Sequence, residues 1–161
     1  MAWRRAQAVR HSITLGHAPL RAMTAREAVP LSFHHVGIAC SDIVAEANTW
    51  RVLGYATEGD PFSDTAQGVQ GMFLAGQAPR LELLQPLAEG GEGVLAPWLR
   101  TGHKMYHLAY ETPELARSID GLRRLRAKLV VEPIPAVAFS GRCIAFLMLP
   151  NRLLVELISS V

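Results

Sequence analysis

The feature that most constrains this chain is an internal repeat. A strand-like stretch with a central histidine occurs around His35 and again around His107, and each is followed by a helix-start signal and by further strand-like stretches. Glu82 follows the first histidine at nearly the same distance as Glu156 follows the second. A repeat of this kind predicts two copies of one supersecondary unit that pack against each other.

The two copies show the same order of elements, one strand followed by a helix and three more strands. In the first copy, we expect a helix that is capped at Ser41 and ended by Gly54, and in the second copy a helix that is capped at Thr112. Strands are expected at 32–40, 55–60, 68–74, 80–85, 105–111, 129–132, 142–149 and 153–158, with a loop at 61–67. The apolar face of the second helix is expected to contain Leu115, Ile119, Leu122 and Leu125.

This pattern predicts an α+β fold, in which two paired β-α-β-β-β modules form one curved mixed sheet. A single module would leave an apolar sheet face open, and pairing two modules buries both faces. The concave side of the sheet is then a cleft, where a functional site is expected. The predicted division is an N-terminal extension at 1–30, a first module at 31–87, a linker at 88–103 and a second module at 104–161.

The N-terminal extension differs in composition from the rest of the chain. Residues 1–30 contain several arginines and a single acid, Glu27. Three interpretations are open: a weakly anchored extension, a stretch upstream of a true start at Met23, or an Arg-rich targeting segment. We favour the first two, because the stretch has no secretory apolar region or cleavage site.

The overall composition is ordinary for a soluble globular protein, and a small molecule is the expected partner. The net charge is +2 with the bases spread along the chain, which does not favour nucleic acid, and no apolar run is long enough to span a bilayer. Cys40 and Cys143 lack metal-site spacing, so reduced thiols in a cytoplasmic protein are expected. A homodimer is also expected, because the edge strands of paired modules often associate.

Four residues at matched positions of the repeat form a candidate metal site: His35, Glu82, His107 and Glu156. A carboxylate in the middle of an apolar strand is costly to bury unless it is paired, protonated or bound to a metal. Two imidazoles with two carboxylates suit a divalent transition metal that keeps positions for water or substrate. Strand alternation predicts that His34 and Tyr106 face away from this site.

Seven segments of the chain match the pattern of a known superfamily. They are His35-Val-Gly-Ile-Ala, Trp50-Arg-Val-Leu-Gly-Tyr55, Gln67-Gly-Val, Arg80-Leu-Glu-Leu-Leu-Gln-Pro-Leu87, His107-Leu-Ala-Tyr, Gly141-Arg142 and Leu154-Val-Glu-Leu157. From about Ser32 to Ser159, the chain resembles the vicinal oxygen chelate superfamily of glyoxalase I, extradiol dioxygenases and fosfomycin-resistance proteins. Within it, the chain is most similar to the methylmalonyl-CoA epimerase family.

This resemblance implies a metal-dependent isomerase that acts on an acyl thioester or a related enolisable carbonyl compound. One divalent ion (Co, Mn, Ni, Zn or Fe) would be held by the four candidate ligands. Of these, Glu82 and Glu156 would also move the α-proton, and Gln67 and Arg142 are the candidates for substrate contact. Some epimerases of the family carry a glutamine where this chain has Glu82, and a catalytic glutamate where this chain has Gly71. A glycine has no side chain that could carry a proton. The alternative bases are Glu58, Asp60 and Asp64.

Other functions use the same scaffold. A glyoxalase-like enzyme or a natural-product tailoring isomerase stays open. An extradiol dioxygenase is less favoured, because Glu82 as a fourth protein ligand would take a position that catechol and oxygen require. A non-catalytic drug-binding resistance protein is less favoured because such relatives lack the ligand set, whereas all four candidates are present here.

Overall fold

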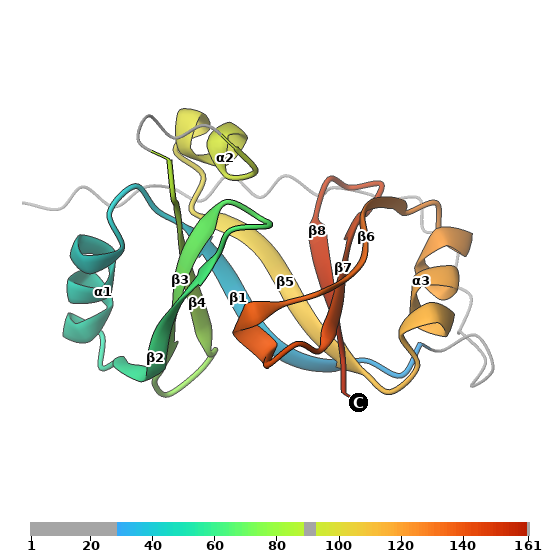
Figure 1. Cartoon of the computed structure of the whole chain (residues 1–161), viewed down its shortest axis with the longest axis horizontal. Helices are drawn as coiled ribbons and strands as arrows, with labels where there is room; N and C mark the ends of the chain where they lie inside the picture. The colour runs from blue at the N-terminus through green and yellow to red at the C-terminus, as the bar shows by residue number, and fades with distance from the viewer. Residues whose placement is uncertain (1–28, 89–92, 161) are drawn as a thin grey trace, which may run out of the picture.

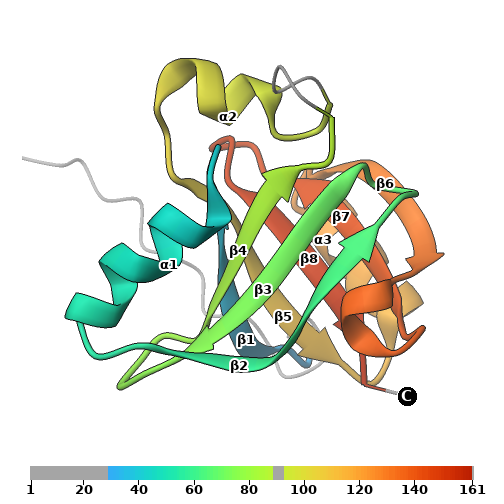
Figure 2. The same ribbon diagram turned by 60° about the vertical axis from the view of Figure 1, so that its left-hand side comes forward.

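The computed structural model describes residues 29–88 and 93–160. Within these ranges, eight strands form one sheet in the order β2-β3-β4-β1-β5-β8-β7-β6, and the sheet curves between its two halves (Figures 1 and 2). No helix of these ranges is long and apolar enough to cross a membrane. The predicted extension up to residue 28, including Met23, lies outside the described residues.

Each half of the sheet follows the predicted order of strand, helix and three strands. The first half consists of β1 (Ser32–Ala39), α1 (Ile43–Val52), β2 (Ala56–Asp64), β3 (Val69–Ala75) and β4 (Leu81–Pro86). The second half consists of β5 (Met105–Thr112), α3 (Leu115–Arg124), β6 (Lys128–Pro135), the short 3-10 helix η1 (Val137–Phe139), β7 (Cys143–Met148) and β8 (Leu154–Ser159). In the chain, the short helix α2 (Ala96–Thr101) comes after the first half and before the second half. The predicted α+β fold class is therefore confirmed.

The two halves meet at the antiparallel pairing of β1 with β5. Its register places Gly37 opposite His107 and His35 opposite Ala109. Each of the two strands also has a parallel neighbour from its own half, β4 beside β1 and β8 beside β5. The four strands that carry the candidate ligands are therefore the four central strands of the sheet.

Alternation along the strands separates an apolar outer face from the face that carries the candidate ligands. Leu81 and Leu83 of β4 pack in the cluster under α1, while Glu82 between them points to the opposite face. In β8, Glu156 likewise points away from the cluster that packs under α3. Figure 1 shows α1 and α3 at the two ends of the molecule, outside the strands that they cover. Helix packing on the outer face thus directs both glutamates inward.

The N-cap of α1 is Asp42 rather than the predicted Ser41. The Asp42 carboxylate accepts hydrogen bonds from the backbone N–H groups of Val44 and Ala45, at 3.0 and 2.9 Å. A carboxylate at this position also interacts favourably with the helix dipole. The helix ends where predicted, since Leu53 is its C-cap and Gly54 follows with a positive φ of 87°.

The second long helix also begins later than predicted. Thr112 is the last residue of β5, and its buried hydroxyl lies 2.7 Å from the hydroxyl of Ser118. The N-cap of α3 is Glu114, and the helix starts at Leu115. Leu125 follows the last residue of α3 and is exposed, so it does not belong to the buried helix face.

Strand β2 is longer than predicted, and part of the loop expected at 61–67 is strand. After an irregularity that follows Glu58, the residues Phe62, Ser63 and Asp64 pair with β3. The sequence of this stretch is polar, so its strand character comes from pairing with β3 rather than from local propensity. The extension matters for the site, because it carries Phe62 to the pocket wall.

The capping geometry predicts that Asp42→Ala lowers the free energy of unfolding by about 1 kcal/mol, because two backbone N–H groups lose their acceptor. Ser41→Ala is the matched control and should change it by less than about 0.5 kcal/mol. Urea unfolding followed by circular dichroism measures both. A loss in Ser41→Ala equal to that in Asp42→Ala would contradict the assignment.

Candidate metal site

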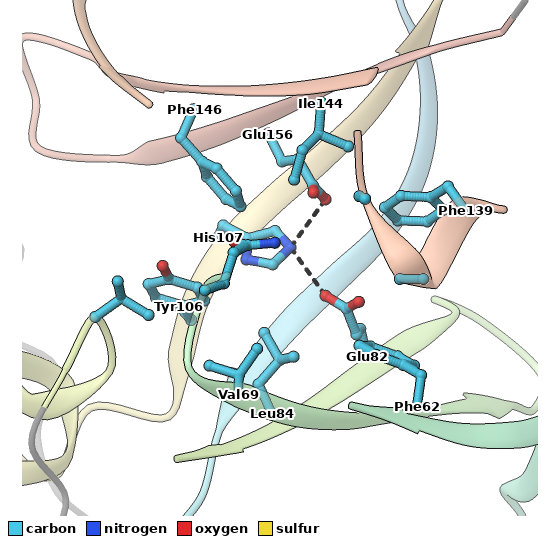
Figure 3. A pocket seen from close by; sticks show the side chains of 14 residues that line it. Phe62, Val69, Glu82, Leu84, Tyr106, His107, Phe139, Ile144, Phe146 and Glu156 are labelled. Atoms are coloured by element: carbon cyan, nitrogen blue, oxygen red, sulfur yellow. Dashed lines mark ion pairs between the residues drawn. The ribbon is translucent and has the colours of Figure 1, made fainter. Parts of the chain in front are cut away.

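The four predicted ligands meet at the middle of the sheet. His35 comes from β1, Glu82 from β4, His107 from β5 and Glu156 from β8. All four are buried, and one ligand atom of each lies within 4.8 Å of the others. Figure 3 shows Glu82 and Glu156 reaching the ring of His107 from two sides. The structure therefore brings together every residue of the predicted set.

The spacing of the donor atoms suits a single ion. The two imidazole Nε2 atoms of His35 and His107 are 2.9 Å apart. They lie 3.1 and 3.4 Å from Glu82 Oε2, and 3.5 and 3.4 Å from Glu156 Oε2. Ligand atoms that bind one metal at about 2.1 Å are about 3.0 Å apart at right angles and about 3.4 Å apart at tetrahedral angles. The observed separations fall close to this range.

Burial controls the charge of the four side chains. Desolvation raises the pKa of Glu82 to about 7, and it raises that of Glu156 to about 8 with a further contribution from the Glu82 carboxylate. Desolvation lowers the pKa of His107 to about 4 and holds that of His35 well below its ordinary value. Both imidazoles are thus neutral at neutral pH, which is the form that binds a metal. A cation among the four groups would favour the ionised carboxylates.

Two polar atoms of the cluster have no hydrogen-bond partner in the described part of the chain, Nδ1 of His107 and Oε2 of Glu156. A buried carboxylate oxygen without a partner is costly. A cation bound by the four donor atoms would be the missing partner of Glu156 Oε2. The donor types, their spacing and this unpaired oxygen all fit a divalent metal ion.

His107 is held in place by packing. Its ring lies over Gly37, where a Cβ atom would come within 2.2 Å of His107 Cε1. The rings of Tyr106 and Phe146 contact it edge-on, with ring centroids 5.0 and 5.3 Å away. Because Gly37 lies directly opposite His107 in the register, the glycine leaves the space that the imidazole occupies.

A pocket opens on the candidate metal site. Glu82, His107 and Glu156 form its polar end (Figure 3). The remaining lining is mostly apolar and consists of Phe62, Gln67, Val69, Leu84, Val94, Tyr106, Ala136, Ala138, Phe139, Ile144 and Phe146. An apolar wall with a few convergent polar groups is typical of a small-molecule site.

The prediction that His34 and Tyr106 face away from the site is wrong. In the pairing of β1 with β5, each of these residues is the extra residue of a β-bulge. A bulge leaves its extra residue unpaired and re-aims the side chain. Tyr106 consequently lines the pocket beside His107 (Figure 3), and His34 Nδ1 lies 2.7 Å from His35 Nδ1. Simple alternation along one strand gives no signal for either position.

The two candidates for substrate contact differ in position. Gln67 lines the pocket. The backbone N–H and the side-chain amide of Gln67 donate hydrogen bonds to the buried carboxylate of Asp64, at 3.0 and 3.1 Å. Arg142 does not line this pocket; it donates to Glu111 at 2.5 Å and to the carbonyl of Ser159 at 3.2 Å. Asp64, considered from the sequence as an alternative base, thus positions Gln67.

The position of Gly71 is covered by an aromatic ring. A Cβ atom there would come within 2.1 Å of Phe62 Cζ. The pocket wall therefore carries Phe62 where the resemblance places the catalytic glutamate of some epimerases. Of the other acids considered as bases, Glu58 pairs with Arg80 at 2.6 Å and Asp60 is exposed, and neither lines the pocket.

Comparison with known proteins identifies the family. Residues 34–146 match the sequence model of the Glyoxalase/Bleomycin resistance protein/Dioxygenase superfamily, and the chain belongs to this superfamily. The chain is 30% identical over 116 residues to an ethylmalonyl-CoA/methylmalonyl-CoA epimerase of Cereibacter sphaeroides. These residues make up 71% of this chain and 85% of that protein. The family predicted from the sequence is therefore confirmed.

Solved structures share the fold. A hypothetical protein from Bacillus halodurans C-125 superposes with a TM-score of 0.70 at 23% identity, covering 82% of this chain and 96% of that one. A methylmalonyl-CoA epimerase of Mycobacterium tuberculosis superposes with a TM-score of 0.65 at 25% identity, covering 80% of this chain and 87% of that one. The described fold is thus shared with a solved methylmalonyl-CoA epimerase.

The ligand cluster predicts that the purified chain binds about one divalent ion and that His107→Ala reduces the metal content to below about a tenth, because an essential donor is lost. His103→Ala is the matched control, since this exposed histidine bonds to Thr101 instead. Elemental analysis after reconstitution measures both. A wild-type chain that takes up none of Co, Mn, Ni, Zn or Fe would contradict the site.

The packing of His107 predicts a second effect. Gly37→Ala should weaken metal binding at least about tenfold and lower the free energy of unfolding by about 1–3 kcal/mol, because the new methyl group displaces the imidazole. Gly76→Ala is the matched control: it crowds the Tyr55 ring, which is no part of the ligand cluster, and should leave metal affinity unchanged. Metal titration and urea unfolding test the pair. Unchanged affinity in Gly37→Ala would argue against the role of the glycine.

Proposed function

We propose that this chain is a metal-dependent epimerase that acts on an enolisable acyl thioester of the methylmalonyl-CoA type. The observation that carries the proposal is the buried cluster of two histidines and two glutamates at the polar end of an apolar pocket. The identity to the epimerase of Cereibacter sphaeroides supports it, because the name of that protein gives ethylmalonyl-CoA and methylmalonyl-CoA.

The chemistry requires stabilisation of an enolate. The α-carbon of a 2-substituted malonyl thioester lies between a thioester and a carboxylate, so its proton is already acidic. A divalent ion held by His35, Glu82, His107 and Glu156 would supply Lewis-acid stabilisation of the negative charge that develops on the carbonyl oxygens. The residues themselves have three tasks: to hold the thioester in place, to exclude water and to move the α-proton.

Proton movement is assigned to Glu82 and Glu156. Each carboxylate directs Oε2 towards the imidazoles, which leaves Oε1 as the atom that receives or returns the α-proton. The two glutamates approach His107 from different sides of the pocket (Figure 3). Inversion needs a base on one face of the α-carbon and an acid on the other, and two carboxyls on different sides meet this requirement.

Other residues of the pocket would hold the substrate. Tyr106 presents a phenolic hydroxyl that makes no hydrogen bond within the described residues, and it can donate one to a substrate oxygen. Gln67, fixed by Asp64, offers a second polar contact. The apolar wall that includes Phe62 and Phe139 would exclude water while the enolate exists.

A glyoxalase-like isomerase is the second candidate function. The observation that favours it is Glu82, a carboxylate ligand where some epimerases of the family carry glutamine. Both candidate reactions begin with removal of an acidic proton next to a carbonyl group, so the same site residues would serve either one. The substrates differ, since the glyoxalase type of reaction starts from an α-keto hemithioacetal.

The proposal predicts that the metal-loaded enzyme washes deuterium into the α-carbon of methylmalonyl-CoA in deuterated water, measured by mass spectrometry. The rate in His107→Ala should fall at least about 100-fold, because the negative charge of the enolate loses its stabilisation. His103→Ala should exchange at the wild-type rate. Exchange no faster than the enzyme-free blank would refute the epimerase assignment, and conversion of an α-keto hemithioacetal would then establish the second candidate.

A further inference from the structure

One position in the apolar wall of the pocket has no side chain of its own and is covered from the neighbouring strand. Gly71 of β3 lies directly opposite Phe62 of the edge strand β2. The tip of the Phe62 ring lies on this glycine, because a Cβ atom at position 71 would come within 2.1 Å of Phe62 Cζ and within 2.7 Å of both Cε atoms. The ring therefore reaches from the edge of the sheet across β3 to the pocket wall.

The second half of the sheet fills the equivalent position in a different way. In each half, a phenylalanine pairs with the candidate ligand glutamate, Phe73 in β3 and Phe146 in β7. The residue two positions earlier is Gly71 in β3 but Ile144 in β7. Ile144 is buried and lines the pocket with its own side chain. In the first half, the same part of the wall depends on Phe62.

An irregularity of β2 aims Phe62 at this position. Glu58 pairs with Phe73 and Phe62 pairs with Gly71, so β2 advances by four residues where β3 advances by two. Extra residues of this kind re-aim the side chains of the strand that contains them. The half-buried Phe62 ring also packs against the Phe73 ring, with a centroid distance of 5.9 Å. Removal of the Phe62 ring would leave Gly71 uncovered.

This part of the wall lies next to the polar end of the pocket. Leu84 follows Glu82 on the same face of β4, pairs with Gly71 and lines the pocket. Figure 3 shows Phe62 and Glu82 on the same side of the pocket. In a 2-substituted malonyl thioester, both carbonyl carbons are bonded to the α-carbon that carries the substituent. Carbonyl oxygens at the polar end therefore bring the substituent to the adjacent apolar wall.

We propose that Phe62 determines the size of the alkyl substituent that the pocket accepts at the α-carbon of the substrate. This inference rests on the proposed function. With the Phe62 ring in place, the wall beside Leu84 is closed and a short substituent fits. Without the ring, Gly71 supplies no side chain, and a hollow opens that an alkyl chain of about four carbons can enter. Entry is favourable because the chain removes its apolar surface from water.

The test compares methylmalonyl-CoA with 2-butylmalonyl-CoA on the metal-loaded protein. Deuterium wash-in at the α-carbon gives kcat/KM for each substrate, and the ratio of the butyl to the methyl value is the readout. Phe62→Ala should raise this ratio at least about tenfold, because a single methylene in an apolar pocket already changes kcat/KM by about that factor. An unchanged ratio would overturn the inference.

Gly71→Ile in the Phe62→Ala background separates the size of the hollow from a general disturbance of the pocket. It gives position 71 the residue that the second half has at Ile144. Gly71 does not have a positive φ, so its backbone accepts a side chain once the Phe62 ring is absent. The ratio should return most of the way to the wild-type value. A ratio that stays raised would place the butyl chain elsewhere and overturn the inference.

Tyr55→Ala is the matched control. It removes an aromatic ring just before β2, but Tyr55 packs with Trp50 in the cluster under α1 and does not line the pocket. Its ratio should equal that of the wild type, and a rise equal to that of Phe62→Ala would overturn the inference. Urea unfolding and metal content check that each variant is folded. Should Phe62→Ala fail to fold, Phe62→Leu should raise the ratio by a smaller factor.

The proposed function and this inference fail in different ways. A wild-type chain that exchanges neither thioester would refute both together. Exchange of methylmalonyl-CoA, with the same substrate ratio in the wild type and in the folded Phe62 variants, would refute this inference alone.

Discussion

The antiparallel pairing of β1 with β5 is the contact on which the rest of the structure depends. It is the junction between the two copies of the repeat, and its register sets each histidine opposite a small residue, His107 opposite Gly37 and His35 opposite Ala109. Each imidazole therefore finds room on the neighbouring strand. The parallel pairings on either side then bring Glu82 and Glu156 to the same level of the sheet. A shift of one residue in the central register would send the side chains to opposite faces and dissolve the site.

The second constraint is electrostatic. Two carboxyls and two imidazoles are buried at the centre of a sheet whose other face packs against apolar helices. Without a compensating cation, burial opposes ionisation of both carboxyls, as the raised pKa values of Glu82 and Glu156 express. Such a cluster is a poor way to stabilise a fold, since apolar residues of similar size would pack there at lower cost. Its presence at matched positions of both repeats is therefore better explained by binding than by stability.

The sequence predicted those features that depend on pattern within one repeat. The order of strands and helices follows from periodicity, and the four-residue cluster follows from comparing one copy with the other. Sequence-based prediction was wrong mainly where the outcome depends on a distant strand. The choice of Asp42 over Ser41 as the helix cap is a local exception, because both residue types suit the position. The last residues of β2, in contrast, form a strand only because they pair with β3. The bulges that turn His34 and Tyr106 inward depend in the same way on how β1 meets β5.

The two bulges also explain how a nearly symmetric ligand set has unequal surroundings. Each bulge places the residue before a candidate metal ligand on the same face as that ligand. In the first copy this residue is His34, which offers a hydrogen-bond partner to Nδ1 of His35. In the second copy it is Tyr106, which packs against His107 and leaves Nδ1 of that ring without a partner among the described residues. His35 is thus oriented by a hydrogen bond, and His107 is oriented by packing on Gly37. Tyr106, which occupies the position that corresponds to His34, lines the pocket. The repeat supplies the candidate ligands twice, but the residue before each candidate histidine differs: His34 contacts His35, whereas Tyr106 lines the pocket.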